Sequence, residues 1–165
     1  MHPAALQWAK QHVPELPRRV VDIGGMDVNC SLRNLYTWSE YVCVDIAPGP
    51  GVDVVMPFQE WAREQPPGSQ DLVVCFEVLE HDRDWEGLVI AARHLLEPGG
   101  LFVGTCAAPG RTPHSAYGFP ELPPDEYYEN VSPASFCMVL SNVGFLTFTV
   151  DRARDGLDLR WVAQA

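Results

Sequence analysis

The sequence predicts an α/β fold with a mostly parallel, seven-stranded sheet, helices on both faces and a C-terminal antiparallel hairpin. Apolar runs that end in an acidic residue recur at 20–25, 41–45 and 71–81, where the chain reads VVDIGG, YVCVD and DLVVCFEVLEH. Helical patterns separate these runs, and strands that alternate with helices pair in parallel through right-handed crossovers. The segments 145–151 and 157–163 alternate in strand fashion around a turn, which predicts the hairpin.

The first half of the chain alternates strand and helix patterns between clear breakers. We expect helices at 3–12, about 31–38 and near 58–65, and strands at 19–23, 41–45 and 52–55. The first helix has Pro3 in its first turn and is expected to cover one edge of the fold. Side chains from Asp27 to Ser31 can cap the second helix, and the Pro-Gly-Pro-Gly sequence at 48–51 predicts a rigid turn.

The second half contains the clearest helix pattern. We expect strands at 71–76 and 101–108, and helices at 85–96 and about 133–142. Apolar residues recur at helical spacing from Trp85 to Leu96, and the Pro-Gly-Gly sequence at 98–100 is expected to end that helix. With 165 residues, of which 47% are hydrophobic, the chain can bury a sizeable core, so we expect a single domain over 1–165.

Composition narrows the classes of partner. The 22 acidic and 11 basic residues give a formal charge of −11, which disfavours a nucleic-acid substrate. No window approaches the roughly 18 apolar residues of a membrane span, and no secretory leader is evident. We therefore expect a cytoplasmic protein, as a monomer or homodimer, with no membrane partner. The five cysteines form no C-x-x-C pair and are expected to be reduced core residues.

Several residues that can contact a ligand follow the predicted strands. Parallel strands present their carboxyl ends at one edge of the sheet, where ligands bind. The residues expected at this edge are Asp22, Gly24, Gly25, Asp45, Phe76 and Glu77. Asp45 is suited to accept two hydrogen bonds from ribose hydroxyls, and the alternative is a turn residue or helix cap. Backbone N–H groups from Gly25 to Asn29 could hold an anionic group such as a carboxylate.

The turn after the first strand argues against a dinucleotide. A pyrophosphate-binding turn would read G-x-G-x-x-G, whereas Gly24 is followed by Gly25, Met26 and Asp27. The Asp27 carboxylate would also repel a pyrophosphate. An adenosyl cofactor without phosphates fits this turn better.

Three motifs in order, VVDIGG, FEVLEH and LLEPGGLFVGT, together with Asp45, resemble the class I S-adenosylmethionine-dependent methyltransferases, particularly a small group with an EVLEH segment. The resemblance spans roughly residues 18–151 and implies a Rossmann-like fold with S-adenosylmethionine as cofactor. It implies that Asp22 and the following glycines shape the turn around the methionine part, and that Asp45 takes the ribose. The expected cofactor-binding residues are Asp22, Gly24, Gly25, Met26, Asn29, Asp45, Ile46, Phe58, Phe76 and Glu77.

The chain departs from the family pattern in two places. Met26 and Val28 stand where the glycine-rich turn usually has its second and third glycines. The acid often found after the third strand is missing, because Met56-Pro57-Phe58 follows that strand. Phe58 could stack on the adenine instead.

Residues 77–84 raise the alternative of a divalent metal site. The acids and the histidine of this segment are Glu77, Glu80, His81, Asp82 and Asp84. Glu80 and His81 resemble the EVLEH segment of the family, and Asp82 or Asp84 can cap the next helix. The histidines also lack zinc-ligand spacing, so we predict no metal site.

The long segment at about 107–131 is predicted to be a lid over the acceptor, because connectors of this length usually carry function. His114 is the expected general base, with Tyr128 as a weaker choice. The expected substrate-binding residues are Arg111, Tyr117, Tyr127 and Asn130. The alternative is that the tyrosines only fix the loop to the sheet.

The sequence and the resemblance together predict methyl transfer to an oxygen or nitrogen of a small-molecule acceptor. Two alternatives remain open at this point. The first is a protein that binds S-adenosylmethionine or S-adenosylhomocysteine without catalysis, and the second is a nicotinamide-dependent oxidoreductase.

Overall fold

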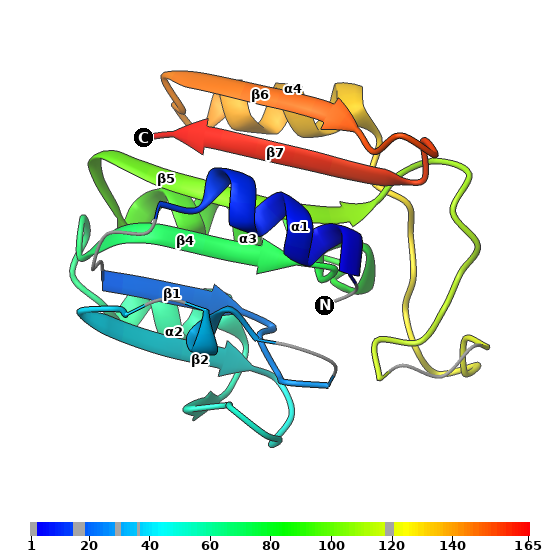
Figure 1. Ribbon diagram of the computed structural model, residues 1–165, viewed down its shortest axis with the longest axis horizontal. Helices are drawn as coiled ribbons and strands as arrows, with labels where there is room; N and C mark the ends of the chain where they lie inside the picture. Colours follow the sequence, from blue (N-terminus) through cyan, green and yellow to red (C-terminus); the bar gives the residue numbers. More distant parts are fainter. Residues whose placement is uncertain (1–2, 15–18, 29–30, 36, 118–120) are drawn as a thin grey trace.

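A computed structural model describes residues 3–14, 19–28, 31–35, 37–117 and 121–165. They form a seven-stranded sheet in the order β3-β2-β1-β4-β5-β7-β6 (Figure 1). The strands from β3 to β5 pair in parallel, and β7 pairs antiparallel with both β5 and β6. The predicted mostly parallel sheet with a C-terminal hairpin is confirmed. No described helix has the length and apolar character that a membrane crossing needs.

The strands are β1 (Arg19–Ile23), β2 (Glu40–Asp45), β3 (Val54–Val55), β4 (Gln70–Phe76), β5 (Leu96–Ala107), β6 (Thr147–Arg152) and β7 (Asp158–Gln164). The α-helices are α1 (Pro3–His12), α2 (Phe58–Glu64), α3 (Trp85–Leu95) and α4 (Pro133–Asn142). Two 3₁₀ turns are η1 (Leu32–Asn34) and η2 (Leu79–His81).

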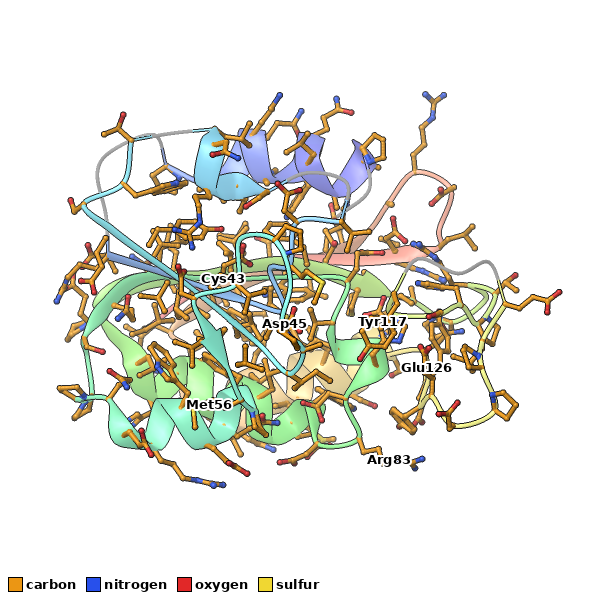
Figure 2. All side chains as sticks on the ribbon, turned by 90° about the horizontal axis from the view of Figure 1, so that it is seen from below. Cys43, Asp45, Met56, Arg83, Tyr117 and Glu126 are labelled. Atoms are coloured by element: carbon orange, nitrogen blue, oxygen red, sulfur yellow. The ribbon has the colours of Figure 1, made fainter. Side chains whose placement is uncertain are left out.

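Helices cover both faces of the sheet, as predicted. Seen along the sheet, α1 and η1 lie on one face, and α2 and α3 lie on the other (Figure 2). Alternate residues of β1 serve the two faces: Val20 packs with α1, whereas Val21 and Ile23 pack with α2 and α3. The expectation that the first helix covers an edge is wrong. Trp8 of α1 packs on the middle of the sheet, against the strands β1, β4 and β5.

The helix expected at about 31–38 is reduced to the single turn η1. Ser31 caps it as expected, since its hydroxyl accepts a hydrogen bond from the Arg33 N–H at 3.2 Å. The Leu32 carbonyl then accepts from both the Leu35 N–H at 3.0 Å and the Trp38 indole at 3.3 Å. Leu32 is the one fully buried apolar residue of this turn, while Leu35 and Trp38 are only partly buried. The described residues of the segment thus offer little buried apolar surface to stabilise a longer helix.

The strand β5 begins earlier than predicted. The Pro-Gly-Gly sequence does not separate α3 from the strand but lies inside β5, where the pairing with β4 shifts between Gln70 and Leu72. Gly99 adopts a φ of 85°, and its N–H donates to the Ala165 carbonyl at 2.9 Å. The glycine therefore turns the backbone within the sheet, a role typical of a bulge.

The β6–β7 hairpin completes the core behind β5. Trp161 of β7 is fully buried, and its ring centroid lies 5.2 Å from Phe102 and 4.7 Å from Phe136 of α4. These rings join the last two strands to α4 and β5. None of these three rings lines the cavity at the carboxyl ends of the parallel strands.

Candidate active site

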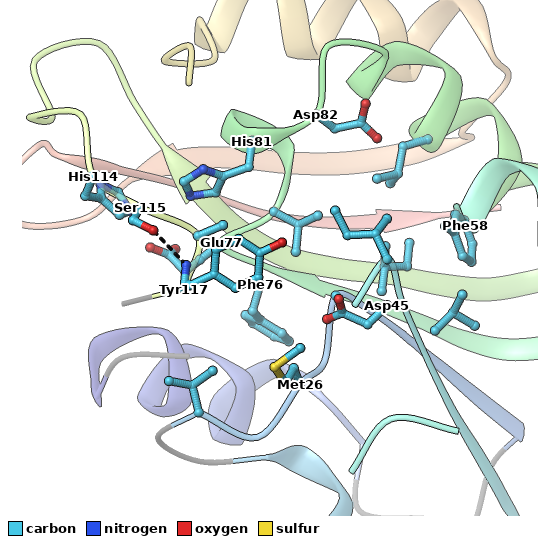
Figure 3. Close-up of a pocket in the computed structure, with 18 of the residues that line it drawn as sticks. Met26, Asp45, Phe58, Phe76, Glu77, His81, Asp82, His114, Ser115 and Tyr117 are labelled. Atoms are coloured by element: carbon cyan, nitrogen blue, oxygen red, sulfur yellow. Dashed lines mark hydrogen bonds between the residues drawn. The ribbon is translucent and has the colours of Figure 1, made fainter. Parts of the chain in front are cut away.

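A cavity of about 380 Å³ opens at the carboxyl ends of β1, β2 and β4. Its walls come from these strand ends, the start of α2, the turn η2 and the loop residues 111–117 (Figure 3). The position agrees with the prediction that a ligand binds at this edge. Apolar lining predominates, with a few carboxylates and imidazoles among it, as in most small-molecule sites.

The turn after β1 needs its glycines. Gly24 lines the cavity with a φ of 63°, and a Cβ there would lie 2.5 Å from Cγ2 of Val78. A Cβ on Gly25 would lie 2.2 Å from a carboxylate oxygen of Asp22. A larger residue at either position would move the wall of the cavity.

Asp22 lies on the side of this turn that faces away from the cavity. Neither Asp22 nor Gly25 is among the lining residues. Only 2% of Asp22 is exposed, and its carboxylate accepts a hydrogen bond from the Tyr41 hydroxyl. Burial raises the pKa of Asp22 to about 7, against the opposing effect of the Tyr41 hydrogen bond. The implied role of shaping the turn fits this position, whereas a direct ligand contact does not.

Asp45 lies at the end of β2 and lines the cavity. Its Oδ1 accepts a hydrogen bond from the Ala47 N–H at 3.0 Å, so the alternative role of turn residue is also present. The second carboxylate oxygen can accept from a ligand hydroxyl. Ile46, Met56 and Phe58 line the cavity nearby, and Phe58 is almost fully buried against Trp61.

Met26 forms part of the wall in place of the usual glycine. It lines the cavity, and its side chain packs so closely on Gly49 that a Cβ there would lie 2.6 Å from the Met26 sulfur. The Asp27 N–H also donates to the Pro50 carbonyl at 2.9 Å. The turn after β1 and the Pro-Gly turn thus form one surface. Asn29, predicted to contact the cofactor, lies outside the described residues.

Phe76 and Glu77 line the centre of the cavity at the end of β4. Glu77 has a φ of 61°, an uncommon backbone conformation for a residue other than glycine. Its N–H donates to the Thr105 carbonyl at 2.7 Å, and the Thr105 hydroxyl donates to its carboxylate at 2.6 Å. Arg111 adds an ion pair at 3.3 Å. Together these contacts hold the Glu77 carboxylate at the cavity.

The loop after β5 closes one side of the cavity through Arg111, His114, Ser115 and Tyr117. Arg111 also pairs with the buried carboxylate of Asp158, so protein carboxylates engage its guanidinium on two sides. Ser115 is 3% exposed, and its hydroxyl donates to Glu126 at 2.8 Å. Glu126 also accepts from the Ala116 N–H at 3.0 Å, which ties the two arms of the loop together.

Two predicted substrate-binding residues do not reach the cavity. The Tyr127 hydroxyl donates to Glu129, and its ring lies under the Arg83 guanidinium at 4.4 Å. The Asn130 side chain donates to the Arg111 carbonyl at 3.0 Å. The alternative in which the tyrosines only fix the loop suits Tyr127 better, although its contacts are with Glu129 and Arg83 and not with the sheet. Asn130 makes its contact with the backbone of the same loop.

Three aromatic rings meet at the loop side of the cavity. The ring centroids of His81, His114 and Tyr128 lie 5.0–5.4 Å apart in edge-to-face pairs. His81 and His114 line the cavity, whereas Tyr128, the weaker candidate base, lies behind them with a buried hydroxyl. Burial lowers the pKa of His81 to about 4 and raises that of Tyr128. Burial, with the nearby Glu77 carboxylate, raises the pKa of Glu80 to about 8.

His81 is one of the cavity residues that the sequence reasoning assigned neither to the cofactor nor to the acceptor. The EVLEH motif contains it, but the motif alone does not say which way the side chain points. The turn η2 directs it toward His114 of the loop.

The known proteins that are similar to this chain are methyltransferases. A family model described as a methyltransferase domain matches residues 3–146. The ubiquinone biosynthesis O-methyltransferase of Xanthomonas euvesicatoria is 32% identical over 130 residues, 68% of this chain and 52% of that protein. The enzyme of the same name from Xylella fastidiosa is 30% identical over 119 residues, 64% of this chain and 48% of that protein. This chain spans about half the length of these curated relatives.

Solved structures share the fold at low sequence identity. A SAM-dependent methyltransferase from Archaeoglobus fulgidus has a TM-score of 0.71 at 13% identity, covering 95% of this chain and 91% of that one. A Burkholderia thailandensis 1,6-didemethyltoxoflavin-N1-methyltransferase, solved with S-adenosylhomocysteine, has a TM-score of 0.66 at 16% identity, covering 99% and 76%. With the family match over most of its length, the chain belongs to the class I S-adenosylmethionine-dependent methyltransferases.

Proposed function

We propose that this methyltransferase transfers the methyl group of S-adenosylmethionine to a hydroxyl oxygen of a small organic acceptor. The observation that carries the proposal is one cavity with two chemically different ends. Asp45 lies at one end, the loop residues His114, Ser115 and Tyr117 lie at the other, and Phe76 and Glu77 lie between them (Figure 3). The relatives named as O-methyltransferases favour oxygen over nitrogen as the acceptor atom.

The Asp45 end of the cavity fits the adenosyl part of the cofactor. A carboxylate oxygen of Asp45 can accept hydrogen bonds from ribose hydroxyls. The apolar side chains of Met56 and Phe58 offer a surface for the adenine ring. At about 380 Å³, the cavity falls within the range of roughly 300–1,000 Å³ typical of small-molecule sites. When bound, the cofactor supplies a methyl group that is already activated by the sulfonium.

The loop end of the cavity fits a neutral, hydroxylated acceptor. Arg111 is engaged by the carboxylates of both Glu77 and Asp158, so no unpaired cation is offered to an anionic acceptor by this side chain. In the transfer, the methyl carbon bonds to the acceptor oxygen while the carbon–sulfur electron pair returns to sulfur. The hydroxyl proton must then leave. The His114 Nδ1 donates to the Thr112 carbonyl at 3.1 Å, so its Nε2 has a free lone pair and can accept that proton.

Alignment is expected to supply most of the acceleration, because in-line positioning can lower the barrier by several kcal/mol. The hydrogen bond between Ser115 and Glu126 holds the loop in the position from which it can align the acceptor. Family membership favours methyl transfer over the nicotinamide-dependent alternative.

The test is a methyl-transfer assay with labelled S-adenosylmethionine and pairs of acceptors that differ only in a hydroxyl or an amino group on the same ring. We expect label on the hydroxyl compounds, at a rate that falls by at least tenfold in His114→Ala. The control variant is His94→Ala, which removes an exposed histidine of α3 that does not line the cavity. Label on amines alone would contradict the acceptor class, and tight cofactor binding without transfer to any acceptor would indicate a non-catalytic binding protein.

A further inference from the structure

Glu80, His81 and His114 bring three potential metal ligands together beside the acceptor end of the cavity. One ligand atom from each lies within 4.8 Å of the other two. Two of them come from η2 and the third from the loop after β5, so only the folded chain assembles the group. We propose that these residues bind a divalent first-row transition-metal ion, although the sequence alone favoured no metal site.

Glu80 supplies the observation that is independent of the spacing. The residue is fully buried, and its Oε1 accepts a hydrogen bond from the Ala107 N–H at 3.1 Å. Its Oε2 is buried and has no hydrogen-bond partner among the described residues. A buried carboxylate oxygen without a partner is costly, and a bound cation would satisfy it.

The two histidines have the arrangement that metal ligands commonly show. The contact between Nδ1 of His114 and the Thr112 carbonyl fixes the ring and leaves Nε2 as a donor of electrons. Metal-binding histidines usually make such a hydrogen bond through their second nitrogen. His81 contacts the rings of both His114 and Tyr128, and its buried Nδ1 has no hydrogen-bond partner in the described part of the chain.

The donor set indicates the class of ion. Two imidazoles and one carboxylate suit Zn²⁺, Co²⁺ or Fe²⁺ better than Mg²⁺ or Ca²⁺, which prefer oxygen ligands. Glu77 is not counted as a ligand, because Thr105 and Arg111 already engage its carboxylate. Bond lengths of roughly 2.0–2.2 Å would draw the three ligands somewhat closer together, and with them the loop toward η2.

The site would also bear on the acceptor, a consequence that rests on the proposed function. Three protein ligands leave at least one coordination position open, as in catalytic zinc sites. Because His81 and His114 both line the cavity, this position would face the acceptor end. A hydroxyl oxygen bound there would be oriented toward the methyl donor and would lose its proton more readily. In the ion-bound protein the Nε2 lone pair of His114 would be engaged by the ion, so His114 would act as a ligand and not as the base.

The experiment measures ion binding directly, on the full chain without an affinity tag. Titration with Co²⁺ is followed by its visible ligand-field absorption, and Zn²⁺ is measured by competition with a chromophoric chelator. We expect one ion per chain and a loss of at least tenfold in affinity in His114→Ala and in Glu80→Gln. His94→Ala should bind the ion as the unchanged protein does. Circular dichroism and S-adenosylhomocysteine binding report whether each variant is folded.

The outcomes separate this proposal from the proposed function. Absence of Co²⁺ and Zn²⁺ binding, or binding that His114→Ala and His81→Ala leave unchanged, would overturn the metal site even if hydroxyl acceptors are methylated. Binding of one ion that these variants weaken would support the site even if no hydroxyl acceptor is methylated.

Discussion

At the scale of single residues, three acids near the carboxyl ends of apolar strands differ in their surroundings. Asp22 is buried behind the turn, Asp45 lines the cavity with one oxygen engaged by the backbone, and Glu77 is fixed by Thr105 and Arg111. The same local pattern therefore places one acid as a support and two at the cavity.

Replacing Asp45 tests its assignment to the ribose. Asp45→Asn removes the charge but keeps the shape, and hydrogen bonds to a charged group are worth roughly 1.5–3 kcal/mol. We expect the dissociation constant of S-adenosylhomocysteine to rise by about 10- to 100-fold in calorimetry. Glu64→Gln removes an exposed charge at the end of α2 and is the control. Equal affinities of the two variants would rule out the ribose contact.

Asp22 predicts a pH dependence of stability. Its pKa is raised to about 7 by burial, so between about pH 4 and 7 the folded state holds a proton that the unfolded state has released. The free energy of unfolding should therefore fall as the pH rises through this window. Asp22→Asn mimics the protonated form and keeps an acceptor for the Tyr41 hydroxyl. Relative to the unchanged protein, it should gain up to about 4 kcal/mol between pH 4 and pH 8.

Urea unfolding of both proteins across that pH range measures the difference. The other groups that act on Asp22, namely Tyr41, Arg33 and Asp45, are common to both proteins and cancel to first order. Parallel stability profiles would mean that Asp22 is ionised in the folded protein near pH 5.

At the scale of the elements, β5 depends on a residue without a side chain. A Cβ on Gly104 would lie 1.9 Å from the Cys75 carbonyl oxygen and 2.4 Å from the Trp161 ring. We expect Gly104→Ala to lower the free energy of unfolding by about 3 kcal/mol or more, because neither β4 nor the buried ring can move away. Chemical unfolding provides the measurement.

Gly144→Ala is the matched comparison for that substitution. Gly144 has a φ of 84° but nothing within 4 Å of a built Cβ, so only backbone strain is added. That strain costs about 1–2 kcal/mol. A Gly104 variant no less stable than the Gly144 variant would contradict the steric argument.

The conformation of the loop after β5 depends on the carboxylate of Glu126, which connects the two arms of the loop. Glu126→Ala removes the acceptor for both the Ser115 hydroxyl and the Ala116 N–H. We expect kcat/KM for the acceptor to fall about tenfold and proteolysis of the loop to accelerate, with cofactor affinity changed less than twofold. Glu121→Ala, which removes an exposed acid of the same loop, is the control. A matching loss of cofactor affinity would mean that the Glu126 hydrogen bonds contribute to cofactor binding instead.

At the scale of the whole molecule, the strand order brings distant segments to one edge. The order β2-β1-β4-β5 sets the three cavity-forming strand ends side by side, and β5 delivers the loop to the same edge. A ligand in this cavity contacts segments from both halves of the chain, so its binding should stabilise the whole fold.

Thermal unfolding measures that coupling. A ligand at 100 times its dissociation constant stabilises the folded state by about 2.7 kcal/mol. For a domain of this size that corresponds to a rise of roughly 5–10 °C in Tm. We expect this rise with S-adenosylhomocysteine and no rise with NAD. A shift with NAD alone would revive the nicotinamide-dependent alternative.

The sequence by itself determined the sheet, most helices and the edge at which the cavity lies. These follow from apolar periodicity, glycine turns and helix caps, which act over a few neighbouring residues. The pattern failed where tertiary contacts overrode it. Leu32 is the one fully buried residue of a short turn, Trp8 packs on a face instead of an edge, and Gly99 bends within a strand.

Only the tertiary structure decided which side chains reach the cavity. Tyr127 and Asn130 turn toward the loop itself, Asp22 faces Tyr41, and His81 meets His114 from another part of the chain. The distance between two side chains depends on how strands stack and how a loop closes. No local pattern along the sequence encodes that distance, because packing between segments far apart in the chain sets it.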